Sequence, residues 1–451
     1  MIPSTPYLLL GPLVLFLPLY LVRRAKPWAG LAAAAALALT AYGCLHLPPD
    51  EGMVLFERTF ALDGLARMAL AWIAGGAALL AAGHAIAGSD SSPAVFLLPA
   101  VSAAGLALAV EPFPLALLAV WIAMLVAMFL FRPEGAGAAR GVSQFIVLTA
   151  VSLPAFLAAS ILLARALTAS MEEIPPWGII AVLFIIGSAA WLSLVPFHAW
   201  GPGLMGVGQP MSGGWVVGIL QPLALFTFVR VLLAHPDLAA EPLAQQIALV
   251  AAAASAALGA VFAATTQHPG RMLGYTALAG IAPLFAVLYA SAGVLSPFHW
   301  MAVLGYSAGV VLASVGLAGI QRGGQPGTLA GLAGAARERG AALALLLCAA
   351  LGLCGLPLGV GFWTHGALRP DMPAMPANAL LVFQIAPLAA AFGWWRVLRA
   401  ATRGREGEPV ALGRTASAVF WALAAAAVML VVWPWPLSRL AEALARAFGS
   451  P

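Results

Sequence analysis

Histidine is the side chain whose charge changes near neutral pH, so a histidine at a break in an apolar helix can take up and release protons where water reaches it. The stretch WLSLVPFHAWGPGLMGVGQPMSGGW places His198 between Pro196 and Pro202, and Pro210 follows. Non-helical backbone at membrane depth persists only inside protein or along a wet cavity. This stretch is therefore the first candidate for proton transfer.

A second stretch, LGLCGLPLGVGFWTHGALRP, has the same character. Pro357 lies between Gly355 and Gly359, and His365 closes the stretch. Matching broken segments in the two halves of a chain are typical of transporters with internal repeats. The alternative is that both are simple kinks, because Gly and Pro are common in spanning helices.

Polar side chains inside apolar runs are further candidates, because a charge at the bilayer centre costs about 2.5–3.5 kcal/mol. Arg165 and Arg396 lie near the ends of their runs and can extend to the interface. A single histidine in a helix is more often a hydrogen-bonded packing residue than a proton carrier. The candidate ion path comprises His198, Gln221, Arg230, His299 and His365.

The sequence lacks the residue patterns that metal binding, redox chemistry or enzymatic catalysis would require. Cys44, Cys348 and Cys354 lie in apolar runs without metal-ligand or redox spacing, and we interpret them as packing residues. The chain has no Walker loop, no dinucleotide-binding glycines after a strand and no nucleophile elbow. We therefore expect no catalytic centre, no cofactor and no metal site in this chain. Any redox chemistry belongs to a partner.

The elements that must position these residues are membrane helices. Of 451 residues, 63% are hydrophobic and 8% are charged, with a mean hydropathy of +0.99, so no water-soluble packing could bury this surface. About 20 apolar residues cross a bilayer as a helix. We expect about fourteen spans, at 6–22, 29–46, 62–87, 94–110, 112–131, 143–168, 177–197, 211–234, 243–265, 273–292, 298–320, 341–366, 378–399 and 413–433.

The net charge of +5 is interpreted as membrane topology rather than nucleic-acid binding. The only lysine is Lys26, so no lysine lies within a span. Basic connections carry Arg23, Arg24, Lys26, Arg132, Arg140, Arg271, Arg322, Arg337, Arg339, Arg399, Arg403 and Arg405, and acidic ones carry Asp50, Glu51, Glu57, Glu172, Glu173, Asp237 and Glu241. Basic loops in the cytoplasm predict an inner-membrane protein with both termini on the outer side.

The tail LSRLAEALARAFG is amphipathic. It spaces Leu437, Leu440, Leu444 and Phe448 on one helical face, with charged residues elsewhere. We expect a short helix on the outer surface or against a partner.

Several motifs in the order of the chain resemble one family. The run VPFHAWGPG…QPMSGGW is similar to the broken seventh helix and the following helix of the antiporter-like subunits of respiratory complex I, Mrp-type cation/proton antiporters and membrane-bound hydrogenases. The segments FALDGLARM, GRMLGYTALAGIA and LAGLAGAARERG followed by GLPLGVGFW also resemble family segments. The matching residues are Phe60, Asp63, Gly64, Leu65, Pro196, Phe197, His198, Trp200, Pro202, Pro210, Ser212, Arg271, Leu273, Tyr275, Leu332, Gly355, Leu356, Pro357, Gly361, Phe362 and Trp363.

The resemblance implies an all-α integral membrane protein with about 14 transmembrane helices and two inverted five-helix repeats. The repeats would occupy residues 93–234 and 242–399, with broken helices near 196–210 and 355–361. Residues 1–92 would form three N-terminal helices, and 413–451 the last helix and the tail, all in one polytopic domain of residues 1–451.

Proton passage in this family follows a central row of ionisable side chains, and the sequence departs from that row. By the resemblance, Ile122 replaces a glutamate, and Trp191, Gln221 and Gly270 replace lysines. His365 also stands at a lysine position and can still titrate. Ile and Trp exchange no proton, and their presence predicts a drier interior.

Three functions follow from this pattern. The chain could move protons or sodium ions within a complex I-like or hydrogenase-like assembly, through His198, His365 and waters. It could instead be a closed-channel structural or adaptor subunit of such an assembly, or a stand-alone carrier for another small solute. The first two imply other antiporter-like and membrane-anchor subunits in the bilayer, and peripheral redox subunits, as partners.

Overall fold

The computed structural model describes residues 4–25, 27–48, 52–55, 58–88, 92–110, 113–131, 136–168, 177–207, 210–291, 293–321, 327–366, 375–404 and 411–447. These residues are almost entirely helical, because apolar runs in a bilayer must pair their backbone groups within each segment. The helices are α1 (Ser4–Leu21), α2 (Trp28–His46), α3 (Gly64–Ala87), η1 (Ser92–Phe96), α4 (Leu97–Ala109), α5 (Phe113–Val126), η2 (Ala127–Leu130), α6 (Ala136–Ala150), α7 (Ser152–Thr168), α8 (Trp177–Trp191), α9 (Trp200–Val207), α10 (Pro210–Trp215), η3 (Val216–Leu220), α11 (Gln221–Ala234), α12 (Pro236–Ala240), α13 (Pro242–Thr265), α14 (Pro269–Ala290), α15 (Pro297–Ile320), η4 (Leu329–Leu332), α16 (Ala335–Glu338), α17 (Gly340–Leu353), η5 (Val360–Phe362), α18 (Trp363–Gly366), α19 (Ala377–Ala401), α20 (Arg414–Val432) and α21 (Trp435–Ala447).

The described residues contain 11 helical segments long and apolar enough to cross a membrane. Shorter apolar helices at Leu115–Leu130, Trp177–Trp191 and Gly340–Leu353 occupy the remaining expected runs. The expected runs 177–197 and 341–366 are not helical throughout, since their helices end at Trp191 and Leu353. A turn at Val151 divides the run 143–168 between α6 and α7. The chain is an integral membrane protein by these criteria.

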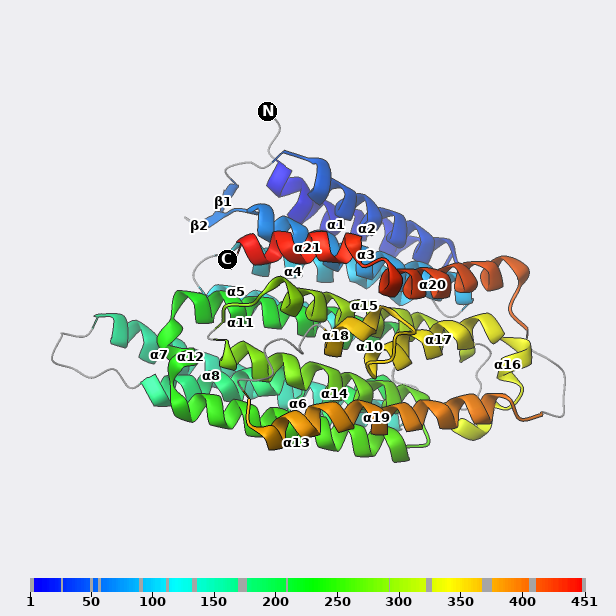
Figure 1. Cartoon of the computed structure of the whole chain (residues 1–451). Helices are drawn as coiled ribbons and strands as arrows, with labels where there is room; N and C mark the ends of the chain where they lie inside the picture. The colour runs from blue at the N-terminus through cyan, green and yellow to red at the C-terminus, as the bar shows by residue number, and fades with distance from the viewer. Residues whose placement is uncertain are drawn as a thin grey trace.

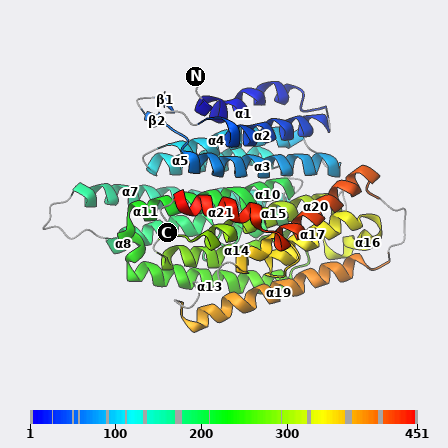
Figure 2. The same ribbon diagram turned by 45° about the horizontal axis from the view of Figure 1, so that its top comes forward.

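The helices run side by side in one elongated bundle (Figure 1). α1, α2, α3 and α4 pack together on one side, and α13, α14 and α19 pack together on the other (Figure 2). α15 packs against α3, α10 and α17, and α14 packs against α9, α13 and α19. α14 and α15 form the core, because 94% of the residues in an apolar 18-residue stretch of each helix are buried.

A short strand pair, β1 (Met53–Leu55) and β2 (Arg58–Phe60), lies at the end of the bundle where α3 begins (Figure 1). The strands are antiparallel, with Met53 opposite Phe60. Ser4 Oγ donates to the carbonyl oxygen of Pro48, 2.7 Å away, so α1 also begins at this end. In Figure 1, α1 begins and α21 ends on this side of the bundle.

Loop contacts bring together three of the basic connections. The N–H of Gly334 donates to the carbonyl oxygen of Arg403, and that of Leu329 to the carbonyl oxygen of Gln267. The segments that carry Arg271, Arg337 and Arg403 therefore lie together. Several loop charges named above fall outside the described residues: Lys26, Asp50, Glu51, Glu57, Arg132, Glu172, Glu173, Arg322 and Arg405.

Candidate functional site

The first interruption lies between α8 and α9, at residues 192–199. The Ser193 hydroxyl accepts from the N–H of Gly201 and donates to the carbonyl oxygen of His198, each at 3.1 Å. The N–H of Val195 donates to Ser255 Oγ on α13, 2.8 Å away. Buried backbone groups need partners, and these side chains supply them where the helix does not. The non-helical segment is therefore a fixed part of the interior.

His198 lies in this segment with a half-buried ring. Its Nδ1 is buried and has no hydrogen-bond partner among the described residues. Pro202 lies in the first turn of α9, and Pro210 is the first residue of α10. Proline is tolerated there, because the first-turn N–H groups have no partner within the helix. The interruption precedes Pro202.

The second interruption follows α17, at residues 354–359. Gly355 has a φ of +78°, a backbone conformation that favours glycine. His365 in α18 donates its Nε2–H to the carbonyl oxygen of Leu353, 2.9 Å away. A Cβ at Gly309 of α15 would lie 3.2 Å from the Cα of Gly361, so two glycines let α15 approach this segment closely.

Trp191 ends α8 inside a cluster of aromatic rings. Its side chain is 1% exposed, and its ring centroid lies 5.0 Å from that of Phe156 and 5.9 Å from that of Phe228. Phe184 joins them, with its centroid 5.4 Å from that of Phe228. The indole Nε1 has no hydrogen-bond partner among the described residues. The position where the resemblance led us to expect a replaced lysine is packed with hydrocarbon rings.

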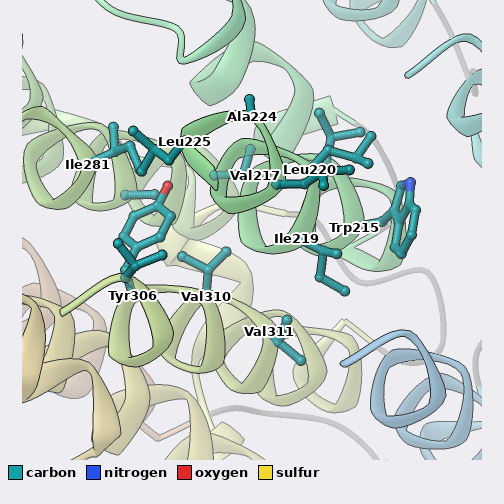
Figure 3. Close-up of a cluster of buried hydrophobic side chains, with 14 of the residues drawn as sticks. Trp215, Val217, Ile219, Leu220, Ala224, Leu225, Ile281, Tyr306, Val310 and Val311 are labelled. Atoms are coloured by element: carbon teal, nitrogen blue, oxygen red, sulfur yellow. The ribbon is translucent and has the colours of Figure 1, made fainter. Parts of the chain in front are cut away.

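Gln221 is 2% exposed at the start of α11 and accepts a hydrogen bond from Tyr306 of α15. The Tyr306 hydroxyl lies 2.8 Å from Oε1 of Gln221. Figure 3 shows the Tyr306 ring among Leu225, Ile281 and Val310. The only titratable member of this pair is a phenol in apolar surroundings, which donates a hydrogen bond rather than relaying protons at neutral pH.

A π-helical turn, η3 at Val216–Leu220, precedes Gln221. Its wider hydrogen-bond spacing is accompanied by a polar contact to α15, where the Ser307 hydroxyl donates to the carbonyl oxygen of Gly218 at 2.6 Å. Trp72 Nε1 of α3 donates in turn to Ser307 Oγ at 2.9 Å. These bonds hold α3, α15 and the π-helical turn together.

His299 caps the start of α15. Its Nδ1 accepts from the N–H of Ser296 at 3.0 Å, and the two residues form a capping box. The ring is 3% exposed. Its position therefore has a structural explanation that does not require ion transfer.

Arg230 donates from Nη1 to the carbonyl oxygen of Leu108, 3.0 Å away. It lines a pocket of about 330 Å³ with Thr227 and His235, at the C-terminal end of α11. Burial lowers the pKa of His235 below its ordinary value, and the nearby Asp237 partly opposes this. The structure brings Arg230 together with His235 rather than with His198.

Ile122 and Gly270, two positions at which we predicted a replaced relay residue, do not lie in a row of interior side chains. Ile122 is 44% exposed on α5, so it faces outward from this chain. Gly270 lies in the first turn of α14, where a Cβ would overlap the carbonyl oxygen of Met205 in α9. A lysine at position 270 would require α9 to move.

The described interior holds few ionisable groups. Among the described residues, the buried side chains include no carboxylate and no lysine, and the buried arginines are Arg67 and Arg339. Arg67 lies in the first turn of α3, and Arg339 immediately precedes α17. No group of three or more metal-ligating side chains occurs in this part of the chain.

Sequence reasoning missed Tyr306 and the ring partners of Trp191. Tyr306 and Ser307 form a polar pair within an otherwise apolar run, and this was a signal that could have found them. The ring partners Phe156 and Phe228 lack such a signal, since phenylalanine in an apolar run is unremarkable.

Comparison with known proteins gives consistent matches. Residues 113–385 match the family described as NADH:quinone oxidoreductase/Mrp antiporter, TM. The chain is 29% identical over 379 residues to NADH-quinone oxidoreductase subunit N of Rhodopseudomonas palustris, covering 82% of this chain and 79% of that one. A relative with the same name from a Caulobacter species is 29% identical over 283 residues, 59% of this chain and 57% of the relative.

Solved structures show the same fold. A chain of respiratory complex I from Thermus thermophilus matches with a TM-score of 0.77 at 23% identity, over 99% of this chain and 100% of that one. A chain of the archaeal membrane-bound sulfane sulfur reductase matches with a TM-score of 0.80 at 16% identity, over 98% of this chain and 97% of that one. A chain of the Mrp complex of Dietzia matches with a TM-score of 0.77 at 15% identity, over 99% of this chain and 98% of that one.

Proposed function

The chain belongs to the NADH:quinone oxidoreductase/Mrp antiporter transmembrane family, and from this premise we propose that it is an antiporter-like membrane subunit of a complex I-related assembly whose own proton relay is interrupted. Its role is then structural, as a closed-channel subunit that joins neighbouring membrane subunits. The names of its relatives and the folds it shares support such an assembly.

The packing of Trp191 carries this proposal. A relay needs side chains or waters that accept and release protons within hydrogen-bond reach. At this position the chain has an indole packed against Phe156 and Phe228, with Phe184 behind them. Apolar cavities of moderate size stay dry, and a filled aromatic cluster leaves still less room for water. Gln221, paired with Tyr306, adds no titrating group.

A second function, a reduced proton path, is favoured by the two histidines at the interruptions. The Nδ1 atom of His198 lacks a hydrogen-bond partner among the described residues, and His365 lies beside Gly355. Such a path would use waters between these rings, and pumping would then depend on His365.

Proton pumping by the reconstituted assembly separates the two functions. We expect H365A to assemble normally and to leave pumping per electron transferred unchanged, because the closed channel carries no protons. Leu358→Ala, at an exposed position of the same segment, controls for local disturbance. Loss of pumping in H365A but not in L358A would refute the closed channel and support the reduced path.

The two interruptions also support the repeat organisation. We propose inverted five-helix repeats at residues 93–234 and 242–399, because each range contains one interrupted helix, at 192–199 and 354–359. The three basic connections that lie together support an inner-membrane topology with those connections in the cytoplasm and both termini outside. Peripheral redox subunits would supply any electron transfer.

A further inference from the structure

The C-terminal helix α21 is amphipathic and lies along the side of the bundle. Leu437, Ala441, Leu444 and Ala445 are buried, and α21 packs against α15 and α3. In Figures 1 and 2, α21 continues from α20 alongside these helices toward the end where the strand pair lies. The expected short amphipathic helix is present, but it extends along the bundle rather than across its end.

Contacts place α21 within membrane depth. Leu440 and Leu444 line an apolar crevice with Met68 and Ile73 of α3 and with Leu304 of α15. α15 begins at Pro297, so Leu304 lies seven residues inside it, roughly 10 Å at 1.5 Å per residue. The 24 residues of α15 extend over roughly 36 Å, only about 6 Å more than the hydrocarbon core. The part of α21 beside Leu304 is therefore below the membrane surface.

The opposite face of α21 carries charge. Arg439, Glu442 and Arg446 are exposed and follow one another at steps of three and four residues, so they form one stripe. The Arg439 guanidinium lies 4.9 Å from the ring centroid of Trp435. Arg446 Nε donates to the carbonyl oxygen of Glu442 at 3.3 Å. Because the apolar face is fixed against α15 and α3, this stripe cannot turn inward.

The neighbouring helix α20 also exposes apolar side chains. Trp421, Met429 and Val432 are 56%, 57% and 77% exposed. Exposed apolar side chains on α20 next to the charged stripe of α21 suit a membrane-crossing helix, whose surface is apolar for much of its length. A water-soluble protein would not reach the α20 residues.

We propose that the outward face of α20 and α21 binds a transmembrane helix of another membrane protein, which presents acidic side chains to Arg439 and Arg446. Charges facing lipid at this depth are costly, and a partner with opposite charges removes that cost. Two arginines flank one glutamate, so the stripe has a net charge of +1 and favours an acidic partner face. This contact surface does not depend on whether the relay conducts.

The test uses the full chain, tagged and purified in mild detergent from its native membranes. We expect R439E/R446E to reduce co-purified membrane subunits at least tenfold, and a compensating acid-to-Arg change in the bound partner to restore them. Arg403→Glu and Arg414→Glu, at exposed positions, are matched charge-reversal controls that should retain the partners.

Two further measurements keep the outcome decisive. Thermal unfolding of each purified variant checks its fold, and R439Q/R446Q replaces the reversal if R439E/R446E unfolds. Mass spectrometry of co-purified phospholipid distinguishes a lipid occupant. Retention of all partner subunits by the folded variant, with or without loss of anionic lipid, would overturn the proposal, as would equal loss in the control variants.

Discussion

Trp191→Ala tests the aromatic cluster directly. The substitution removes two ring pairs, with Phe156 and with Phe228, and leaves a cavity where a 1% exposed side chain stood. Each aromatic pair contributes about 0.5–1.5 kcal/mol, so the pairs alone amount to about 1–3 kcal/mol. In soluble cores Trp→Ala costs about 3–5 kcal/mol in all. Removal of apolar surface from water contributes little to packing between membrane helices, so we expect Trp191→Ala to lower the stability by about 2–4 kcal/mol.

Thiol reactivity provides the assay. Cys44 and Cys354 are buried and free, so a maleimide dye reports thermal unfolding of the purified chain in detergent. A loss of 1 kcal/mol lowers the Tm by about 2–4 °C in a chain of 150–250 residues and by less in a longer chain, so we expect the Tm to fall by roughly several degrees.

Trp421→Ala, at a 56% exposed position on α20, should change the Tm little. The cavity should also stay dry, so proteoliposomes with W191A should leak no more protons than wild type. Equal Tm values for W191A and W421A, or a new proton leak in W191A, would refute a packed and dry cluster.

Three further predictions concern single positions. Tyr306→Phe should lower stability by about 1–3 kcal/mol because it leaves the buried Gln221 oxygen unpaired, and Y306F/Q221L should recover most of this loss in a double-mutant cycle. Gly270→Ala should lower the Tm more than Gly404→Ala, a change in open space, because the added Cβ overlaps α9. Burial lowers the folded-state pKa of His235, and Asp237 opposes this shift more weakly. The unfolded chain therefore binds the proton first, so stability should fall as the pH drops below about 6.5. H235Q should flatten this pH dependence of the Tm, and an unchanged profile would contradict the prediction.

The approximate positions of the membrane helices and of the two interruptions could be predicted from the sequence, because both depend on local composition. Long apolar runs predict spans wherever they occur, and Pro357 with its flanking glycines ends α17 by local chemistry. The place of the first interruption was harder to predict. By residue type alone, Pro202 and Pro196 are equally able to interrupt a helix. Pro202, however, lies in the first turn of α9, where proline is tolerated.

The environment of each candidate residue depends on long-range packing, and here sequence reasoning was weaker. His299 stood out as a polar residue in an apolar run, and its pairing with Ser296, three residues earlier, was a local signal for a helix cap. The predicted correspondence of Ile122 to a glutamate gave no indication that this side chain, 44% exposed, faces outward from α5. The rings around Trp191 come from α7, α8 and α11, which no local pattern relates.

The distribution of charge suggests one physical origin for the scarcity of charged side chains among the buried residues and for the charged face of α21. A chain that conducts protons must hold ionisable groups inside, where an orphan charge costs about 3–5 kcal/mol if its partner is lost. In the described part of this chain, the exposed stripe on α21 carries Arg439, Glu442 and Arg446, while the buried side chains include no lysine and no carboxylate. Charges on an outer face can be paired by another subunit without opening a path through the chain.

Placing ionisable side chains at positions 122 and 191 tests whether the interior can conduct. Trp191→Lys should destabilise the chain strongly, because the cluster offers an ammonium group no partner. Ile122→Glu should also lower the Tm, because its 44% exposed position lies in the middle of a spanning helix, where a charge costs about 2.5–3.5 kcal/mol. A glutamate at an outward-facing position cannot neutralise an inward-facing lysine, so we expect I122E/W191K to be no more stable than W191K and to conduct no protons. If the double variant regained both stability and proton flux in the reconstituted assembly, the two positions would face each other there. The interior would then be a channel that lacks only its charges.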